Sequence, residues 1–188
     1  MSNAQQEGRR TLIIISLLFI SPIIIAVYMY FGGSSWVPGT STEHGELIKP
    51  PRTLPDTPIR GQDDQFRKIW SLVVVADKSC DADCITALEH IRQIRLSLGP
   101  KMTRMQTVFL PASETAIAPV LLNGEHPKLI VVPPEVNGEF REIIGPYENA
   151  EIFMVDPLGN LMMRYAPGTG MGDIRKDIAH LYKLSGIG

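Results

Sequence analysis

The sequence predicts an α/β fold behind a single N-terminal transmembrane helix. Three observations lead to this expectation. Residues 11–31 are apolar and uncharged, a Val-rich run over 69–76 is followed by two cysteines and a helical pattern, and a hairpin signal over 151–165 precedes a last amphipathic stretch. Strand and helix patterns that alternate along a chain are typical of α/β domains.

Composition limits the class of protein. The 188 residues are 44% hydrophobic and 20% charged, with a formal net charge of −2. This length allows one ordinary domain with an attachment. Because there is no basic excess, no nucleic-acid partner is expected. Two cysteines exclude a disulfide-rich scaffold and leave one bridge or one two-thiol site as the maximum.

The N-terminal residues are expected to anchor the chain in a membrane. Residues 1–10 would be cytoplasmic and residues 11–31 would form the transmembrane helix, because 21 residues at about 1.5 Å each match the hydrocarbon thickness of a bilayer. Arg9 and Arg10 precede this run and no Lys or Arg follows before Lys49, so the positive-inside rule sends the rest of the chain across. The alternative is a cleaved signal peptide, which the length of the run and the lack of a small-residue cleavage site disfavour.

Residues 32–65 are expected to be a tether. Gly and Ser come first, and the Pro-rich stretch KPPRTLPDTP follows. Such a composition is flexible at first and then stiffer and extended. A folded domain over residues 66–188 would therefore work close to the membrane surface.

The first unit of that domain is expected to be a βαβ crossover. Ile69–Ala76 (IWSLVVVA) is typical of a strand buried on both faces. Cys80 and Cys84 follow, and apolar residues then recur at helical spacing as far as the stop at Gly99–Pro100. Arg104–Leu110 (RMQTVFL) is the next expected strand. The crossover between the two strands is expected to be right-handed.

The middle of the domain gives a weaker pattern. Thr115–Leu122 is expected to be a short helix, Leu129–Val132 a short strand, and Glu135–Ile144 one or two helical turns.

The C-terminal part is expected to form a β-hairpin and a helix. Glu151–Val155 and Asn160–Tyr165 flank Asp156-Pro157-Leu158-Gly159, whose residues favour a tight turn. Gly172 or Asp173 is expected to cap a last helix. The apolar stripe of this helix would be Ile174, Ile178, Leu181 and Leu184. A βαβ start and a ββα finish are the arrangement of a thioredoxin-like fold.

The candidate site is Cys80-Asp-Ala-Asp-Cys84. Residues four apart at a helix start lie within disulfide reach, and a helix N-terminus stabilises thiolate. The same two thiols suit Cu(I). Three roles stay open: thiol–disulfide exchange, metal binding, and a purely structural disulfide. Asp77, Asp81 and Asp83 work against a strongly lowered thiol pKa, because carboxylates disfavour a nearby thiolate.

The four histidines are not expected to be metal ligands. His44 falls in the expected tether, His90 lies six residues past Cys84 on the same helix, and His180 is in the last helix. His126 stands beside Pro127 in the irregular middle. A surface or core position is the simpler interpretation of each.

With these motifs the sequence resembles the Sco family, membrane-anchored thioredoxin-like proteins that deliver copper to cytochrome c oxidase. The likeness covers roughly residues 66–188. It rests on the anchor, on IWSLVVVA leading into a Cys-x3-Cys pair, on IFMVDPLGNLMMRY and on PGTGMGDIRKDIAHLYKL. The chain also looks like a shorter relative encoded near oxidase assembly genes in proteobacteria, a likeness to which HGELIKPP contributes.

The resemblance implies a function and a place in the cell. Cys80 and Cys84 would act in thiol exchange, in Cu(I) handling, or in both. The partner would be a respiratory oxidase subunit or another assembly factor. The protein would be a single-pass protein of the bacterial inner membrane with its C-terminal domain in the periplasm. The competing hypothesis is a non-catalytic interaction module whose two cysteines form a fixed disulfide.

The sequence departs from the family at two positions of the site. Asp81 stands where the family has Pro after its first cysteine. Glu148 stands nine residues before Pro157, where the family supplies a copper-binding His, and no His lies between Pro127 and His180. The resemblance therefore carries over the two thiols without the imidazole, so Cu(I) binding is expected and strong Cu(II) binding is not. No Pro directly precedes the strand at 151 either, so the cis-Pro docking feature of thioredoxins is not expected.

Overall fold

The computed structural model describes residues 3–31, 43–55, 66–77, 79–114, 124 and 126–185. Contacts within the chain separate two units, Met1–Ser41 and Thr42–Gly188. The helix expected over residues 115–122 lies outside the described residues.

The first unit contains helix α1 (Asn3–Phe31), which has Pro22 in its interior. Its segment Gly8–Tyr28 spans 21 residues with a mean hydropathy of 2.6, and none of it is buried inside the protein. In the part of the chain that the structure describes, this is the one helix long and apolar enough to cross a membrane. The chain therefore carries one N-terminal transmembrane candidate.

The second unit is built on a mixed sheet of six strands in the order β1-β6-β5-β2-β3-β4. Its central strand, β2 (Trp70–Ala76), is buried along its whole length, as a Val-rich run predicts. It pairs in parallel with β3 (Met105–Pro111) and antiparallel with β5 (Glu151–Val155). The remaining strands are β1 (Glu46–Thr53), β4 (Leu129–Val131) and β6 (Asn160–Tyr165).

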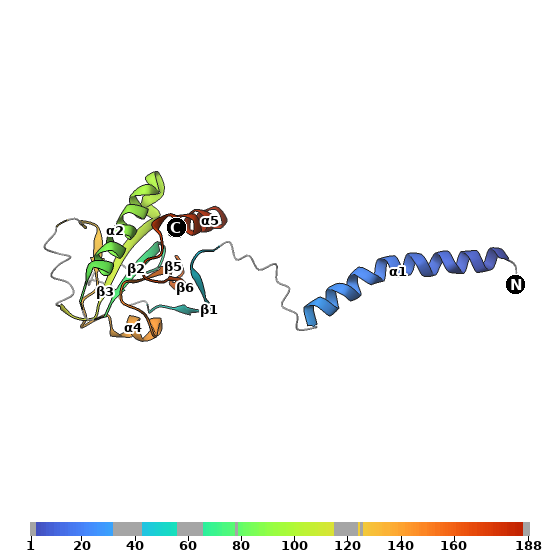
Figure 1. Cartoon of the computed structure of the whole chain (residues 1–188), viewed down its shortest axis with the longest axis horizontal. Helices are drawn as coiled ribbons and strands as arrows, with labels where there is room; N and C mark the ends of the chain where they lie inside the picture. The colour runs from blue at the N-terminus through green and yellow to red at the C-terminus, as the bar shows by residue number, and fades with distance from the viewer. Residues whose placement is uncertain are drawn as a thin grey trace. The chain divides into compact units, whose positions relative to one another are not determined.

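Helices cover both faces of the sheet (Figure 1). Side chains of α2 (Ala82–Ser97) and α5 (Met171–Leu184) share one hydrophobic cluster with the sheet, and those of α4 (Gly138–Ile144) share the other. The 3-10 helix η1 (Gly99–Arg104) joins α2 to β3. The order β2-α2-β3 followed by β5-β6-α5 confirms the predicted thioredoxin-like fold.

The stretch expected to be a tether contains strand β1. It pairs antiparallel with β6, from Glu46 opposite Arg164 to Thr53 opposite Asn160. The register shifts between Leu47 and Arg52, so the Lys49-Pro-Pro segment bulges away from its neighbour. Proline is tolerated there because β1 is an edge strand. Because prolines are rare in strands, the sequence pattern did not indicate β1. The folded unit therefore begins well before residue 66.

His44 is likewise held by the domain and is not part of a free tether. The buried carboxylate of Asp177 in α5 accepts hydrogen bonds from the backbone N–H groups of His44 and Gly45, at 2.9 and 3.1 Å. His44 Nδ1 lies 3.0 Å from the same carboxylate. These contacts fix the chain onto α5 immediately before β1.

Helix α5 differs from its prediction at both ends. It begins at Met171 with Gly170 as the N-cap residue, so the expected caps Gly172 and Asp173 lie inside the helix. At the other end Leu184 is 72% exposed. Tyr182 is buried in its place, because it lies four residues after Ile178 and packs on Trp70 with 5.8 Å between ring centroids.

Candidate redox site at the junction of β2 and α2

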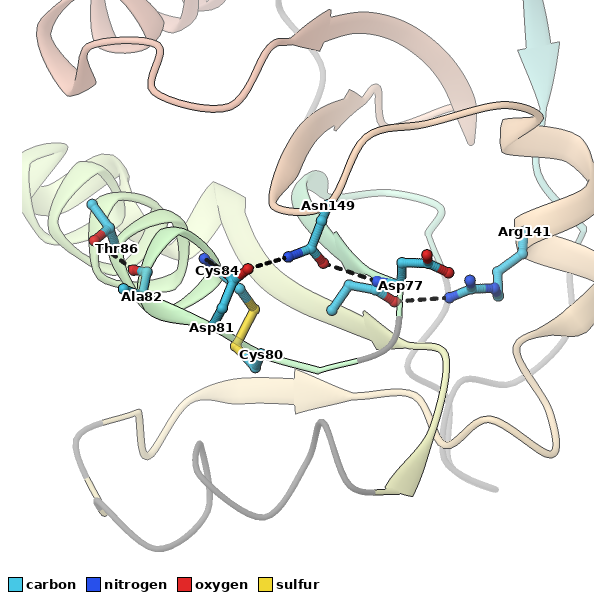
Figure 2. The surroundings of a disulfide bond; sticks show 9 residues. Asp77, Cys80, Asp81, Ala82, Cys84, Thr86, Arg141 and Asn149 are labelled. Atoms are coloured by element: carbon cyan, nitrogen blue, oxygen red, sulfur yellow. Dashed lines mark hydrogen bonds between the residues drawn. A yellow bond between two sulfur atoms is a disulfide. The ribbon is translucent and has the colours of Figure 1, made fainter.

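Cys80 and Cys84 are joined by a disulfide bond, and their Cα atoms are 5.0 Å apart. Cys80 lies in the loop after β2 and Cys84 in the first turn of α2, where the sequence predicts them (Figure 2). The pair sits at the end of the central strand. The described residues contain no free cysteine.

Both cysteines are buried, Cys84 more completely than Cys80. Cys84 is fully buried and Cys80 is 6% exposed. Both belong to the apolar cluster between the sheet and α2, together with Val74, Leu88 and Ile91. Such surroundings disfavour a charged thiolate at Cys84. Of the two cysteines, Cys80 is the less buried and precedes the helix, so we expect an external thiol to reach it first.

Asp81 caps the helix that carries the site. Its backbone is extended, and its Oδ1 accepts a hydrogen bond from the Cys84 N–H at 3.0 Å. Asp is among the preferred N-cap residues, which explains why α2 starts directly after it. The carboxylate also takes up the positive end of the helix. A negative charge thus occupies the place that would otherwise stabilise a thiolate.

Asn149 ties the loop before β5 to the disulfide loop. Its Nδ2 donates to Asp81 Oδ2 at 2.9 Å, and its Oδ1 accepts from the Asp77 N–H at 3.0 Å (Figure 2). The Ala150 N–H adds a bond to the Val75 carbonyl at 3.0 Å. One amide therefore bridges Asp77, before the disulfide loop, and Asp81, inside it.

Arg141 supports the same region from α4. Its Nη1 donates to the carbonyl of Ala76, the last residue of β2, at 3.2 Å (Figure 2). Its guanidinium lies 4.9 Å from the centre of the Tyr147 ring. Burial lowers the pKa of Arg141, and the negative charge of Asp77 opposes that shift. Arg141 thus fixes the strand end from which the cysteine loop departs.

Sequence reasoning missed both Asn149 and Arg141. They are far from the cysteines along the chain, and neither belongs to a recognisable spacing. The available signal for Asn149 was its place next to residue 148, where the resemblance puts a ligand. Arg141 offered no such signal.

Three of the four histidines have surroundings that do not include the cysteines. His44 is bound to Asp177, and His126 borders a hollow with Arg92 and Arg95. His90 faces a groove beside α2 that Asp83 and Thr169 also line. At residue 148, where the resemblance implies a ligand, the Glu148 N–H donates to Glu151 Oε2 at 2.9 Å.

Among the described residues, no three His, Cys, Asp or Glu side chains gather as a group that could hold a metal ion. The donor set at the site is two sulfurs. After reduction this set fits two-coordinate Cu(I), which accepts soft ligands. It does not fit a copper site that needs an imidazole.

Solved structures share this fold. The apo Sco1 protein of Thermus thermophilus superimposes with a TM-score of 0.54 and 22% identity, over 78% of this chain and 99% of that one. Yeast Sco1 gives 0.53 and 15%, over 72% and 97%. BsSco, described as a member of the Sco family of cytochrome c oxidase assembly proteins with a disulfide switch, gives 0.51 and 13%, over 74% and 100%. At these identities the likeness establishes the thioredoxin-like fold.

The comparison with curated protein sequences gives no significant match. A family model described as the transmembrane-like, thioredoxin-like, C-terminal domain matches residues 70–185, which is more than half of the chain. The matched range runs from the first residue of β2 to the end of α5 and includes the disulfide. The chain belongs to this transmembrane-like, thioredoxin-like family.

Proposed function

We propose that this protein is a membrane-anchored, Sco-like thiol–disulfide protein that serves the assembly of a respiratory cytochrome oxidase. The observation that carries the proposal is the Cys80–Cys84 disulfide at the β2–α2 junction of a thioredoxin-like domain. The N-terminal transmembrane candidate supports the anchor. The likeness in fold to Sco proteins supports the oxidase as partner.

The proposed reaction is exchange with a dithiol of a partner protein. A partner thiolate attacks the Sγ of Cys80, the less buried cysteine, and Cys84 leaves as a thiolate that takes up a proton. The second partner thiol then attacks the mixed disulfide and releases Cys80. The partner loses two electrons and two protons, and this protein becomes the dithiol. The reverse sequence reduces a partner disulfide, such as a cysteine pair awaiting copper.

Copper enters this proposal as cargo. The reduced pair provides two thiolates for one Cu(I), which a partner with a larger set of ligands can take over. We propose that the domain lies in the periplasm of a bacterium, with α1 in the inner membrane. Arg9 and Arg10 before the apolar run support this orientation.

A second candidate function is supported by the burial of the site. In this alternative, Cys84 is fully buried, Asp81 is held at the helix cap, and the disulfide has the structural role of linking α2 to the end of β2 in an interaction module. The reduction potential distinguishes the two functions, because structural bridges lie below about −300 mV and exchangeable ones above it.

The experiment is a redox titration of the full chain in detergent against dithiothreitol mixtures, with thiols counted by alkylation. A potential above about −300 mV supports exchange. In addition, Cys84→Ser leaves Cys80 able to form a mixed disulfide that cannot resolve, so it should capture the partner, and Cys80→Ser is the matched control. A lower potential together with no Cys80-dependent capture would favour the interaction module.

A further inference from the structure

Several elements end together at the side of the domain opposite the disulfide. Trp70, the first residue of β2, pairs with Met105, and the hairpin turn after β5 follows Val155, which pairs with Ser71. Arg104 Nη2 donates to the Ser185 carbonyl at 3.3 Å, which brings the end of α5 to the same place. We call the segments 66–70, 95–104, 156–159 and 181–185 the basal pole. The disulfide follows the other end of β2, about 20 Å away for seven residues.

Exposed apolar side chains concentrate at the basal pole. In the described part of the Thr42–Gly188 unit, five large hydrophobic residues are exposed, and four of them lie there. They are Leu96 (51%), Met102 (37%), Leu158 (54%) and Leu184 (72%). Leu158 and Leu184 border a groove lined also by Trp70, Met162 and Leu181. The fifth, Val136 (50%), lies in the turn after β4, away from the basal pole.

Positive charge is concentrated in the same segments. The basal pole has one acidic residue, Asp156, whose carboxylate accepts bonds from the N–H groups of Leu158 and Asn160. Its basic residues number six, although the whole chain has a net charge of −2. They are Arg67, Lys68, Arg95, Lys101, Arg104 and Lys183. Two of them are bonded to the hairpin turn. The backbone N–H of Lys68 donates to the Pro157 carbonyl at 2.7 Å, and Arg67 Nη1 donates to the Leu158 carbonyl at 3.1 Å.

We propose that the basal pole rests on the surface of an anionic lipid bilayer. Apolar side chains that enter the acyl boundary, surrounded by lysines and arginines that meet phosphate headgroups, are the chemistry of an interfacial site. The apolar residues come from four separate parts of the chain, α2, η1, the turn after β5 and α5, which suits a broad planar surface better than a single peptide in a groove.

The anchor brings this surface to the lipid. This step rests on the membrane anchor of the proposed function. Residues 32–42 separate the end of α1 at Phe31 from Glu43, and eleven residues reach at most about 40 Å. Weak contacts are then sufficient, because attachment to the bilayer makes docking intramolecular. A docked domain presents Cys80 at its far end, where a partner that projects from the membrane can reach it.

The test uses tryptophan quenching by lipids with brominated acyl chains. The full chain with Trp36→Phe is reconstituted into vesicles of phosphatidylcholine, alone or mixed with phosphatidylglycerol. Leu158→Trp and Leu184→Trp report on the basal pole, and Val136→Trp is a control of similar exposure near Glu135. Trp70 gives a constant background because it is 3% exposed.

We expect quenching of the two basal probes at least about twofold above the control, and only with phosphatidylglycerol present. Lys68→Gln and Lys183→Gln should each lower the ratio of docked to undocked domain by about fivefold. Lys176→Gln, on the same helix but paired with Asp173 at 2.9 Å, should change it little.

Other results would overturn the proposal. Equal quenching at all three positions, or none in a chain that floats with the vesicles, would exclude docking and leave the proposed function standing. Protection of the basal probes from aqueous acrylamide without bromolipid quenching would assign the surface to a protein partner or a second copy. A chain that does not float would refute the anchor and the docking together, whereas the redox titration would still test the disulfide.

Discussion

Removing the charge of Asp81 should make the reduced site more reactive. The carboxylate is one residue from Cys80 and accepts the Cys84 N–H at 3.0 Å. Asp81→Asn keeps an oxygen for this cap, since Asn and Asp cap helices about equally well. It removes the negative charge that opposes a thiolate. The variant therefore separates the electrostatic role of Asp81 from its structural one.

The size of the effect follows from the position of the charge. A like charge within a few ångströms disfavours the thiolate, and Asp81 is exposed, so solvent screens part of this effect. Removal of one such charge should raise the thiolate fraction at neutral pH by up to about tenfold. Nucleophilicity falls with basicity, so the net gain in alkylation rate is about threefold.

The assay follows Cys80 alone, in a Cys84→Ser background, by thiolate absorbance at 240 nm against pH and by the rate of iodoacetamide labelling. Asn149→Ala is the matched control, because it breaks the 2.9 Å link to Asp81 and keeps the charge. The Cys80 thiol should not become more reactive in the Asn149→Ala variant. High salt should reduce the difference between the Asp81→Asn variant and the Cys84→Ser parent protein. If the Asn149→Ala variant reacts as fast as the Asp81→Asn variant, the loop link controls reactivity and the electrostatic argument is wrong.

Three further predictions concern the domain and its cargo. Gly45→Ala should lower the free energy of unfolding by about 1–3 kcal/mol in urea, because a Cβ there would lie 2.5 Å from the Tyr165 ring; an unchanged midpoint would contradict the close approach. Burial raises the pKa of Glu151, so the folded state holds its proton more tightly than the unfolded one. Urea titrations should therefore show wild type gaining stability relative to Glu151→Gln as pH falls from 7 toward the ordinary Glu value, and a loss would refute this sign. The reduced protein should bind one Cu(I) that Cys80→Ser abolishes and should bind Cu(II) weakly; an intensely coloured, stoichiometric Cu(II) complex would contradict the two-sulfur donor set.

The parts of the fold that could be predicted from the sequence are those whose signal is local. The Val-rich run of β2, the Gly99–Pro100 stop and the turn at Asp156–Gly159 each specify their own conformation. Strand β1 could not be found this way, because Pro50 and Pro51 lie within it and its pairing depends on β6, more than a hundred residues away. The exposure of Leu184 also depends on tertiary packing, because Tyr182 packs on the Trp70 ring and is buried in the core instead.

The candidate site divides in the same way. Cys80 and Cys84 are close because they are four residues apart at a helix start, which is a local property. Asn149 lies beside the cysteine loop only because β5 pairs antiparallel with β2. The sequence suggests that pairing but does not determine its register. A long-range hydrogen bond of this kind depends on strand register, and one residue of slip would turn the amide away.

The two positions at which the resemblance implies a Pro and a His, residues 81 and 148, are physically linked in this structure through Asp81 and Asn149. These residues meet directly, with Asn149 Nδ2 2.9 Å from Asp81 Oδ2. A Pro at 81 would offer this amide no carboxylate, and without Asn149 the carboxylate would lose a donor beside the buried disulfide. The loop that contains Glu148 and Asn149 is thus bound to the helix cap, through a contact that orders the disulfide loop and supplies no imidazole. This coupling supports the proposed thiol exchange, with Cu(I) as cargo, over an imidazole-assisted copper centre.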